Sequence, residues 1–80
     1  MKLSVIESKI DDIIDSSKLN LFSMIKRKLE GEDASLIEDA VEIIEKDLEE
    51  KRTNLKVYFK DQKEKIKEES FNRIIKDYIL

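Results

Sequence analysis

The 80-residue chain has no cysteine, no histidine and no proline, and it contains a single glycine. Without cysteine there is no disulfide framework and no zinc site built from thiolates. Without histidine the chain lacks the most common general base and the most common metal ligand. One glycine cannot form a glycine-rich phosphate-binding loop or a Gly-x-Ser-x-Gly nucleophile elbow. These absences predict a protein that is not an enzyme and that binds no cofactor or metal.

Long apolar runs are also missing. The longest stretch without a charged residue is Leu19–Ile25, seven residues, whereas a transmembrane helix needs about twenty. The first residues do not include the apolar segment that is typical of a signal peptide. We therefore expect a cytoplasmic protein with no membrane span.

Charge is abundant, since 44% of the residues are Asp, Glu, Lys or Arg, but the net charge is only −3. That total is too small to indicate a polyanionic or polycationic partner by itself. The apolar residues make up 40% of the chain, which is enough for a small core. Because chains below roughly 70–80 residues rarely gain more than about 3–5 kcal/mol from one core, we expect self-association to complete it.

Helical periodicity dominates the first three quarters of the chain. Apolar residues recur at spacings of three and four over 4–29 and again over 36–59, which predicts two helices. The segment 30–35 between them contains Gly31, which can adopt the left-handed conformation that ends a helix. The sequence therefore predicts an antiparallel helical hairpin.

Local signals suggest where these helices begin and where they are weak. Two capping boxes, in which a hydroxyl and a carboxylate satisfy free amides of the first turn, begin the helices: Ser4 with Glu7, and Ser35 with Glu38. Ser and Asn residues at 16–20, and Thr and Asn at 53–54, compete for backbone hydrogen bonds. They predict a bend or break within each helix.

The end of the chain is different. The segment 60–70 is charged and has Ile66 as its one apolar residue, and an amphipathic helix follows over 71–80. The apolar side chains of this helix share one face: Phe71, Ile74, Ile75, Tyr78 and Ile79. Burial stabilises each large apolar side chain by about 1.5–3 kcal/mol, so this face is expected to be covered. It can fold back through a break in 60–70, pack on a second copy, or bind another protein as a helix in a groove. We predict that it forms a contact with a partner or a second copy.

Charge complementarity supports the hairpin. If the helices are antiparallel about Gly31, residue i lies opposite roughly residue 63 − i. The acidic and basic residues that then face each other are Asp11, Asp12 and Asp15 with Lys51 and Arg52, Glu7 with Lys56, and Lys26, Arg27 and Lys28 with the acids that follow the turn. Each exposed pair contributes only about 0–1 kcal/mol, so these charges set the register more than the stability.

An acidic stripe lies on the second predicted helix. Residues 31–50 contain nine acidic residues and one basic residue. At helical spacing the stripe consists of Glu38, Glu42, Glu45 and Glu49. It is consistent with a solvated helix face, with antiparallel self-association of acidic against basic segments, or with a mimic of DNA phosphates that occupies a DNA-binding protein.

A basic stretch follows the acidic stripe. It consists of Lys51, Arg52, Lys56, Lys60, Lys63 and Lys67. Clustered Lys and Arg residues could neutralise the phosphates of a nucleic acid. Acidic residues are scattered among these bases, so a nucleic-acid-directed role is the alternative hypothesis and not the first.

Two further patterns have simpler explanations. Carboxylates one helical turn apart could share Mg²⁺, as in Glu42 with Glu45, Asp12 with Asp15, and Glu30 with Asp33. In so acidic a chain such spacings arise by chance, and we predict no metal site. The basic amphipathic stretch 21–29 could lie on an anionic membrane surface, but its apolar side is needed to cover the second helix, which assigns it to the core.

Together these patterns predict a single all-α domain over 1–80. Its architecture is an antiparallel helical hairpin or a small three- or four-helix bundle, completed by self-association. We expect a regulator, adaptor or inhibitor that acts on another protein through helix–helix contacts.

Overall fold

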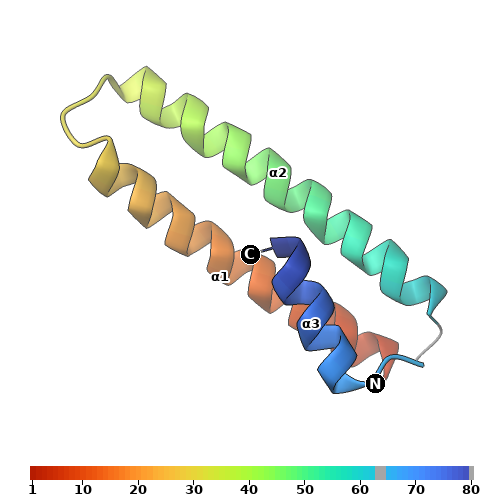
Figure 1. Cartoon of the computed structure of the whole chain (residues 1–80). Coiled ribbons are helices and arrows are strands. Elements are labelled where there is room, and N and C mark those ends of the chain that lie inside the picture. Colours follow the sequence, from red (N-terminus) through yellow and green to blue (C-terminus); the bar gives the residue numbers. More distant parts are fainter. Residues whose placement is uncertain (63–64, 80) are drawn as a thin grey trace.

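The computed structural model of the chain describes residues 1–62 and 65–79 and contains three helices in that part. Helix α1 spans Leu3–Lys28, α2 spans Ala34–Asp61 and α3 spans Glu68–Ile79. The first two form an antiparallel hairpin, and α3 folds back onto the half of the hairpin that contains the N-terminus (Figure 1). The molecule is elongated, measuring 48 × 18 × 18 Å. The predicted all-α hairpin is therefore confirmed, as a three-helix arrangement.

The turn between α1 and α2 depends on Gly31. Its φ of 86° is in the left-handed region, which glycine adopts readily because it has no Cβ. The amide of Glu32 donates a hydrogen bond to the carbonyl of Leu29 at 3.0 Å, which closes the turn. The left-handed conformation predicted for Gly31 is confirmed.

Both predicted capping boxes are wrong. Helix α1 begins at Leu3, so Ser4 lies within its first turn. Helix α2 begins at Ala34 and is capped by Asp33, whose side chain accepts a hydrogen bond from the amide of Ser35 at 3.0 Å. A carboxylate at this position bonds a free amide and also carries a negative charge that suits the positive end of the helix dipole. Asp33 therefore caps α2 and Ser35 does not.

The breaks predicted at 16–20 and 53–54 are also wrong, because α1 and α2 are continuous through both segments. The Thr53 hydroxyl donates to the carbonyl of Glu49 at 3.2 Å, so its polar group is satisfied within the helix. The Asn54 side-chain amide donates to the hydroxyl of Tyr78 on α3 at 3.2 Å. Polar side chains in α2 thus find partners that do not compete with its backbone bonds.

The charged segment predicted at 60–70 is shorter than expected. Helix α2 extends to Asp61, and α3 begins at Glu68, before the first apolar residue of its stripe. The two acidic residues of the first turn of α3 suit the positive end of its dipole. Between the helices, Ile66 packs against the core and its carbonyl accepts a hydrogen bond from the amino group of Met1 at 2.9 Å. These contacts hold the start of α3 beside the start of α1.

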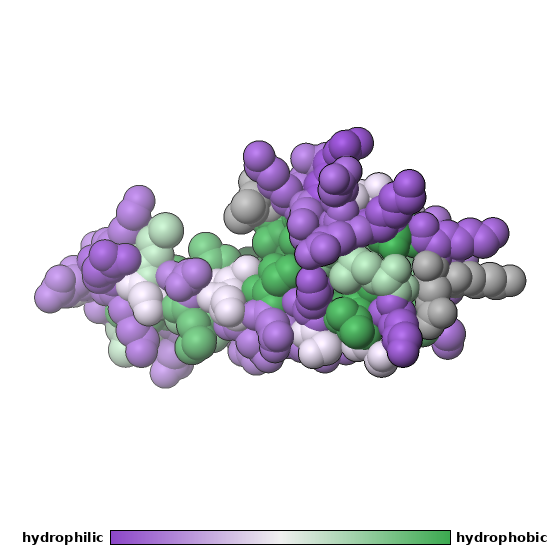
Figure 2. Space-filling model, turned by 90° about the horizontal axis from the view of Figure 1, so that it is seen from below, coloured by the Kyte–Doolittle hydropathy of each residue, from purple (hydrophilic) through white to green (hydrophobic). Residues whose placement is uncertain are grey.

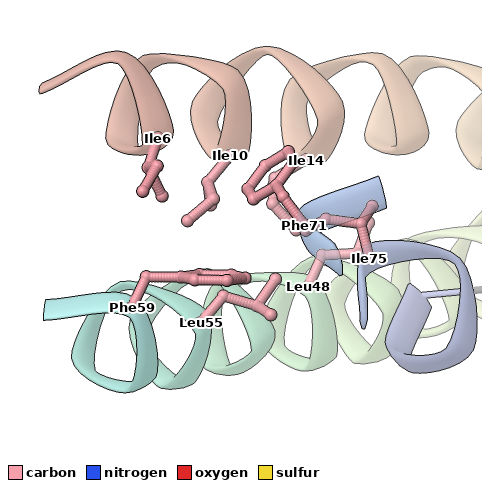
Figure 3. Close-up of a cluster of buried hydrophobic side chains, with 8 residues drawn as sticks. All are labelled: Ile6, Ile10, Ile14, Leu48, Leu55, Phe59, Phe71 and Ile75. Carbon is pink, nitrogen blue, oxygen red and sulfur yellow. The ribbon is translucent and has the colours of Figure 1, made fainter. Parts of the chain in front are cut away.

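The core lies where the three helices meet. Its buried side chains are Ile6, Ile10 and Ile14 from α1, Leu48, Leu55 and Phe59 from α2, and Phe71 and Ile75 from α3 (Figure 3). The rings of Phe59 and Phe71 are 5.1 Å apart between centroids. The C-terminal apolar face therefore folds back on the hairpin of its own chain, which is one of the three possibilities that the sequence left open. Self-association stays a prediction.

Candidate interaction surface

A network of ion pairs joins α1 and α2 along one side of the hairpin. The Arg52 guanidinium donates to Asp11 and to Asp15 at 2.6 Å each, and to Glu49 at 3.2 Å. The predicted pairing of Arg52 with this acidic part of α1 is thus confirmed. Lys56 lies 2.8 Å from a carboxylate oxygen of Asp11.

The register differs slightly from the predicted one. Lys56 pairs with Asp11, and not with Glu7 as expected. Lys18 likewise pairs with Glu49. These two pairs place the helices about one turn away from the predicted alignment, because the size of the turn around Gly31 could not be fixed from the sequence.

The ion pairs shift the pKa values of the groups involved. Hydrogen bonds from Lys56 and Arg52 hold the pKa of Asp11 below its usual value of 3.8. Hydrogen bonds from Lys18 and Arg52 hold the pKa of Glu49 below its usual value of 4.5. The Asp15 carboxylate, with Asp11 and Glu49, raises the pKa of Arg52. The network therefore favours the charged forms and helps to fix the register of the hairpin.

We expect the protein to lose stability as the pH falls below about 4. The folded-state pKa values of Asp11 and Glu49 lie under the unfolded ones, so the unfolded chain binds more protons in that range. The stabilisation is present above pH 4.5 and is lost as the pH falls through the lowered pKa values. Urea denaturation between pH 2 and 6 measures this, and Asp11→Asn should flatten the curve. An equally steep curve for that variant would contradict the role of Asp11.

The predicted basic stretch is divided by the fold. Arg52 and Lys56 are bound to carboxylates of α1. Lys51 lies 3.2 Å from Asp47, and its ammonium group is 6.0 Å from the centre of the Tyr78 ring. Lys60 on α2 and Lys67 before α3 are exposed, and Lys63 lies outside the described residues. Part of the positive charge is therefore neutralised within the chain.

The predicted acidic stripe is mostly free. Glu38, Glu42 and Glu45 are exposed on α2, whereas Glu49 bonds Lys18 and Arg52. In the described ranges, no three acidic side chains converge in a way that could hold a metal ion. These exposed carboxylates give the surface of α2 a negative charge.

The predicted contact residues of α3 have two different locations. Phe71 is 1% exposed and Ile75 is 8% exposed, so both belong to the core of their own chain. Ile74 and Ile79 are half-buried, and Tyr78 is 41% exposed. Of the five residues, only these last three have surface that a partner could contact.

A shallow apolar hollow lies between α2 and α3. It has a volume of about 300 Å³ and is lined by Asn54, Leu55, Tyr58, Ile74 and Tyr78. Both tyrosines are partly exposed, and the hydrogen bond from Asn54 to Tyr78 runs along it. It is a small local depression beside α3.

The larger uncovered apolar surface lies on the other half of the hairpin, toward the turn. Helix α3 forms a ridge over one part of the molecule and leaves the rest as a lower layer (Figure 2). No side chain from residue 15 to residue 47 is buried, although this stretch is rich in apolar residues. Leu21, Asp47 and Leu48 line a hollow at the end of α3. Helical spacing from these residues toward the turn places further apolar side chains on the same side, and we name this surface the distal groove: Leu21, Met24, Leu36, Ala40, Ile43 and Ile44.

The distal groove was not predicted from the sequence, which assigned 21–29 to the core. Ile43 is 69% exposed, and Met24 and Leu36 are nearly half exposed. The available signal is that apolar residues of α2 between residues 36 and 44 cover more than the single stripe needed to pack on α1. A second apolar face of this kind indicates a second contact.

No family model, curated protein or solved structure matches the chain. Within residues 1–62 and 65–79, none of the helices is long and apolar enough to cross a membrane.

Proposed function

We propose that this protein is a small non-enzymatic regulator, adaptor or inhibitor that binds another protein through helix–helix contacts. The observation that carries the proposal is the exposed apolar surface of the distal groove. Large apolar side chains gathered on one side of a small protein are typical of an interaction site. Ile43 and Leu36 from α2 and Met24 from α1 are the exposed large apolar residues of the distal groove.

The charged surface fits the same role. Interfaces usually combine an apolar centre with a polar rim. Beside the apolar residues of the distal groove, Asp39 and Lys46 share a hollow with Ile43, and Asp47 and Lys51 share the hollow at the end of α3. The rim would set the orientation of the partner and the rate of association, and the apolar side chains would provide most of the affinity.

Capture by chemical cross-linking tests this function. The bait is the tagged full chain, and the test variant carries Met24→Ser with Ile43→Ser. The matched control carries Leu19→Ser with Val57→Ser, which removes two apolar residues outside the groove that are 68% and 57% exposed. We expect at least one protein of the native host to be captured by the unmodified and control baits and at least tenfold less by the test bait. Equal recovery by all three baits would contradict the proposal.

Sedimentation of the full chain tests the further prediction of self-association. A monomer at all concentrations would remove the second copy from the set of partners. A dimer that the Met24→Ser, Ile43→Ser variant abolishes would make the second copy the partner.

A further inference from the structure

We propose that the distal groove binds one amphipathic helix of a different protein, with a net positive charge, placed end to end with α3. This inference rests on the proposed function and specifies the kind of partner. It follows from the continuity of the groove with the seat of α3, from the space that α3 leaves free and from the charge along α2.

The groove begins where α3 ends. A hollow of about 220 Å³ lies at the end of α3, and Leu21 from α1, Leu48 from α2 and Ile79 from α3 are among its lining residues. The two hairpin helices that hold the apolar face of α3 therefore continue past its last turn. The surface ahead of Ile79 is an extension of an existing helix-binding surface.

Apolar residues continue along this line on both helices. Residues three and four apart share a helix face, so Met24 follows Leu21 on α1, and Ile44 precedes Leu48 on α2. Asp47 also lines the hollow, and Ile43 lies one turn before it. One and two turns further toward the Gly31 turn, the same face of α2 carries Ala40 and Leu36. These apolar side chains are similar to those that contact α3, but no helix within residues 1–62 and 65–79 covers them.

The free length suits one short helix. At 1.5 Å per residue, α1 with 26 residues is about 39 Å long and α3 with 12 residues is about 18 Å long. Because Ile79 at the end of α3 lies beside Leu21 and Asp47, about 10 Å of α1 and about 20 Å of α2 stay uncovered, which is room along α2 for a helix of roughly 13 residues. A helix of that length presents about four turns of apolar stripe to the groove.

The charge of the groove favours a basic helix. Residues 31–50, which form the turn end and the first part of α2, contain nine acidic residues and one basic residue. Glu49 is bonded to Lys18 and Arg52, but Asp39, Glu42 and Glu45 are exposed. Asp39 and Glu42 share a hollow with Ile43 and Lys46, so lysine and arginine residues flanking the apolar stripe of a partner helix would lie near these two carboxylates.

A second hairpin of the same chain fits this groove poorly. If two hairpins stack on this side with their turns at the same end, the two α3 ridges coincide and hold the groove surfaces apart. If the turns are at opposite ends, the two-fold axis places α2 on α2 of the other copy. The acidic first halves of the two α2 helices would then face each other and repel. The α3 ridges therefore exclude the arrangement with both turns at the same end, and repulsion between acidic residues opposes the arrangement with the turns at opposite ends.

Three synthetic peptides test the inference against the full chain. The first is a 14-residue helix with leucines at i, i+3, i+4 and i+7 spacing and lysine or arginine at the polar positions. The second has the same leucines and glutamate at the polar positions. The third has the composition of the first with the leucine spacing scrambled, so that it retains the charge and loses the stripe. Fluorescence anisotropy of the labelled peptides measures binding to the unmodified chain and to both double-serine variants.

We expect the basic striped peptide to bind at least tenfold more tightly than the other two. Its affinity should fall at least tenfold with Met24→Ser plus Ile43→Ser and stay unchanged with Leu19→Ser plus Val57→Ser.

Equal affinity of the scrambled basic peptide would overturn the inference, because charge alone would explain binding. Equal affinity of the acidic striped peptide, still sensitive to the test variant, would overturn the basic partner and leave the proposed function intact. The absence of binding by any peptide would also overturn the inference, and the capture experiment would then decide the function separately.

Discussion

Replacing Phe71 with alanine is expected to lower the free energy of unfolding by about 3–5 kcal/mol. Phe71 is 1% exposed, and its ring packs 5.1 Å from the ring of Phe59. The substitution leaves a cavity where α3 meets both helices of the hairpin. This loss is comparable with the whole stability of so small a core, so a variant that is already unfolded without denaturant agrees with the expectation.

Urea denaturation followed by circular dichroism measures this loss. Tyr78→Ala is the matched control because Tyr78 is on the same helix but 41% exposed, and we expect it to cost about 1 kcal/mol. If Phe71→Ala cost no more than Tyr78→Ala, the packing of α3 against its own hairpin would be contradicted.

Replacing Ile10 with alanine is expected to lower the free energy of unfolding by about 2–5 kcal/mol. Ile10 is fully buried, in the middle of the isoleucine stripe that α1 presents to α2 and α3 (Figure 3). The same substitution at Ile43, which is 69% exposed, is expected to change stability by less than about 0.5 kcal/mol. Thermal and urea unfolding of the two variants give the comparison.

The contrast between these isoleucines separates two uses of apolar residues in one chain. Ile10 stabilises the fold by packing in the core, whereas Ile43 is proposed to contact a partner. A large loss of stability in Ile43→Ala, approaching that of Ile10→Ala, would mean that the distal part of α2 is packed within the chain. The distal groove could not then be a free binding surface.

The hairpin and its charge pairing could be predicted because they depend on local and repeated signals. Apolar residues at helical spacing define α1 and α2, and Gly31 marks the turn between them. Once the helices are antiparallel, counting residues on each side of the turn places Arg52 within about one helical turn of both Asp11 and Asp15.

The helix boundaries and the continuity of the helices could not be predicted, because several local signals compete. Asp33 and Ser35 are both good capping residues, and only the folded backbone selects Asp33. Asn54 is a weak helix former whose side chain finds Tyr78 on α3, a partner that is distant in sequence. Tertiary contacts of this kind override helix propensity.

The sequence limits the C-terminal helix to a few possible positions, but it does not determine which of them α3 takes. The stripe from Phe71 to Ile79 showed that its apolar face must be covered, and the structure covers it with α1 and α2 of the same chain. The distal groove escaped prediction for a related reason. Periodicity shows that Ile43 and Ile44 are on helical faces, but it does not show how far along the hairpin α3 reaches.

The most direct test of the account is to determine which chain α3 lies on and which half of the hairpin it covers. Because the chain has no cysteine, Lys76→Cys places one spin label on α3, and paramagnetic broadening of the amide signals reports its neighbours. We predict broadening around Ser17, Asn20 and Lys51 of the labelled chain itself, little effect near Ile37, and no effect in a mixture of labelled unenriched chains with unlabelled ¹⁵N-enriched chains. Broadening that appears in the mixture, or that extends to Leu36 and Ile37 at the turn end of the hairpin, would contradict this position of α3.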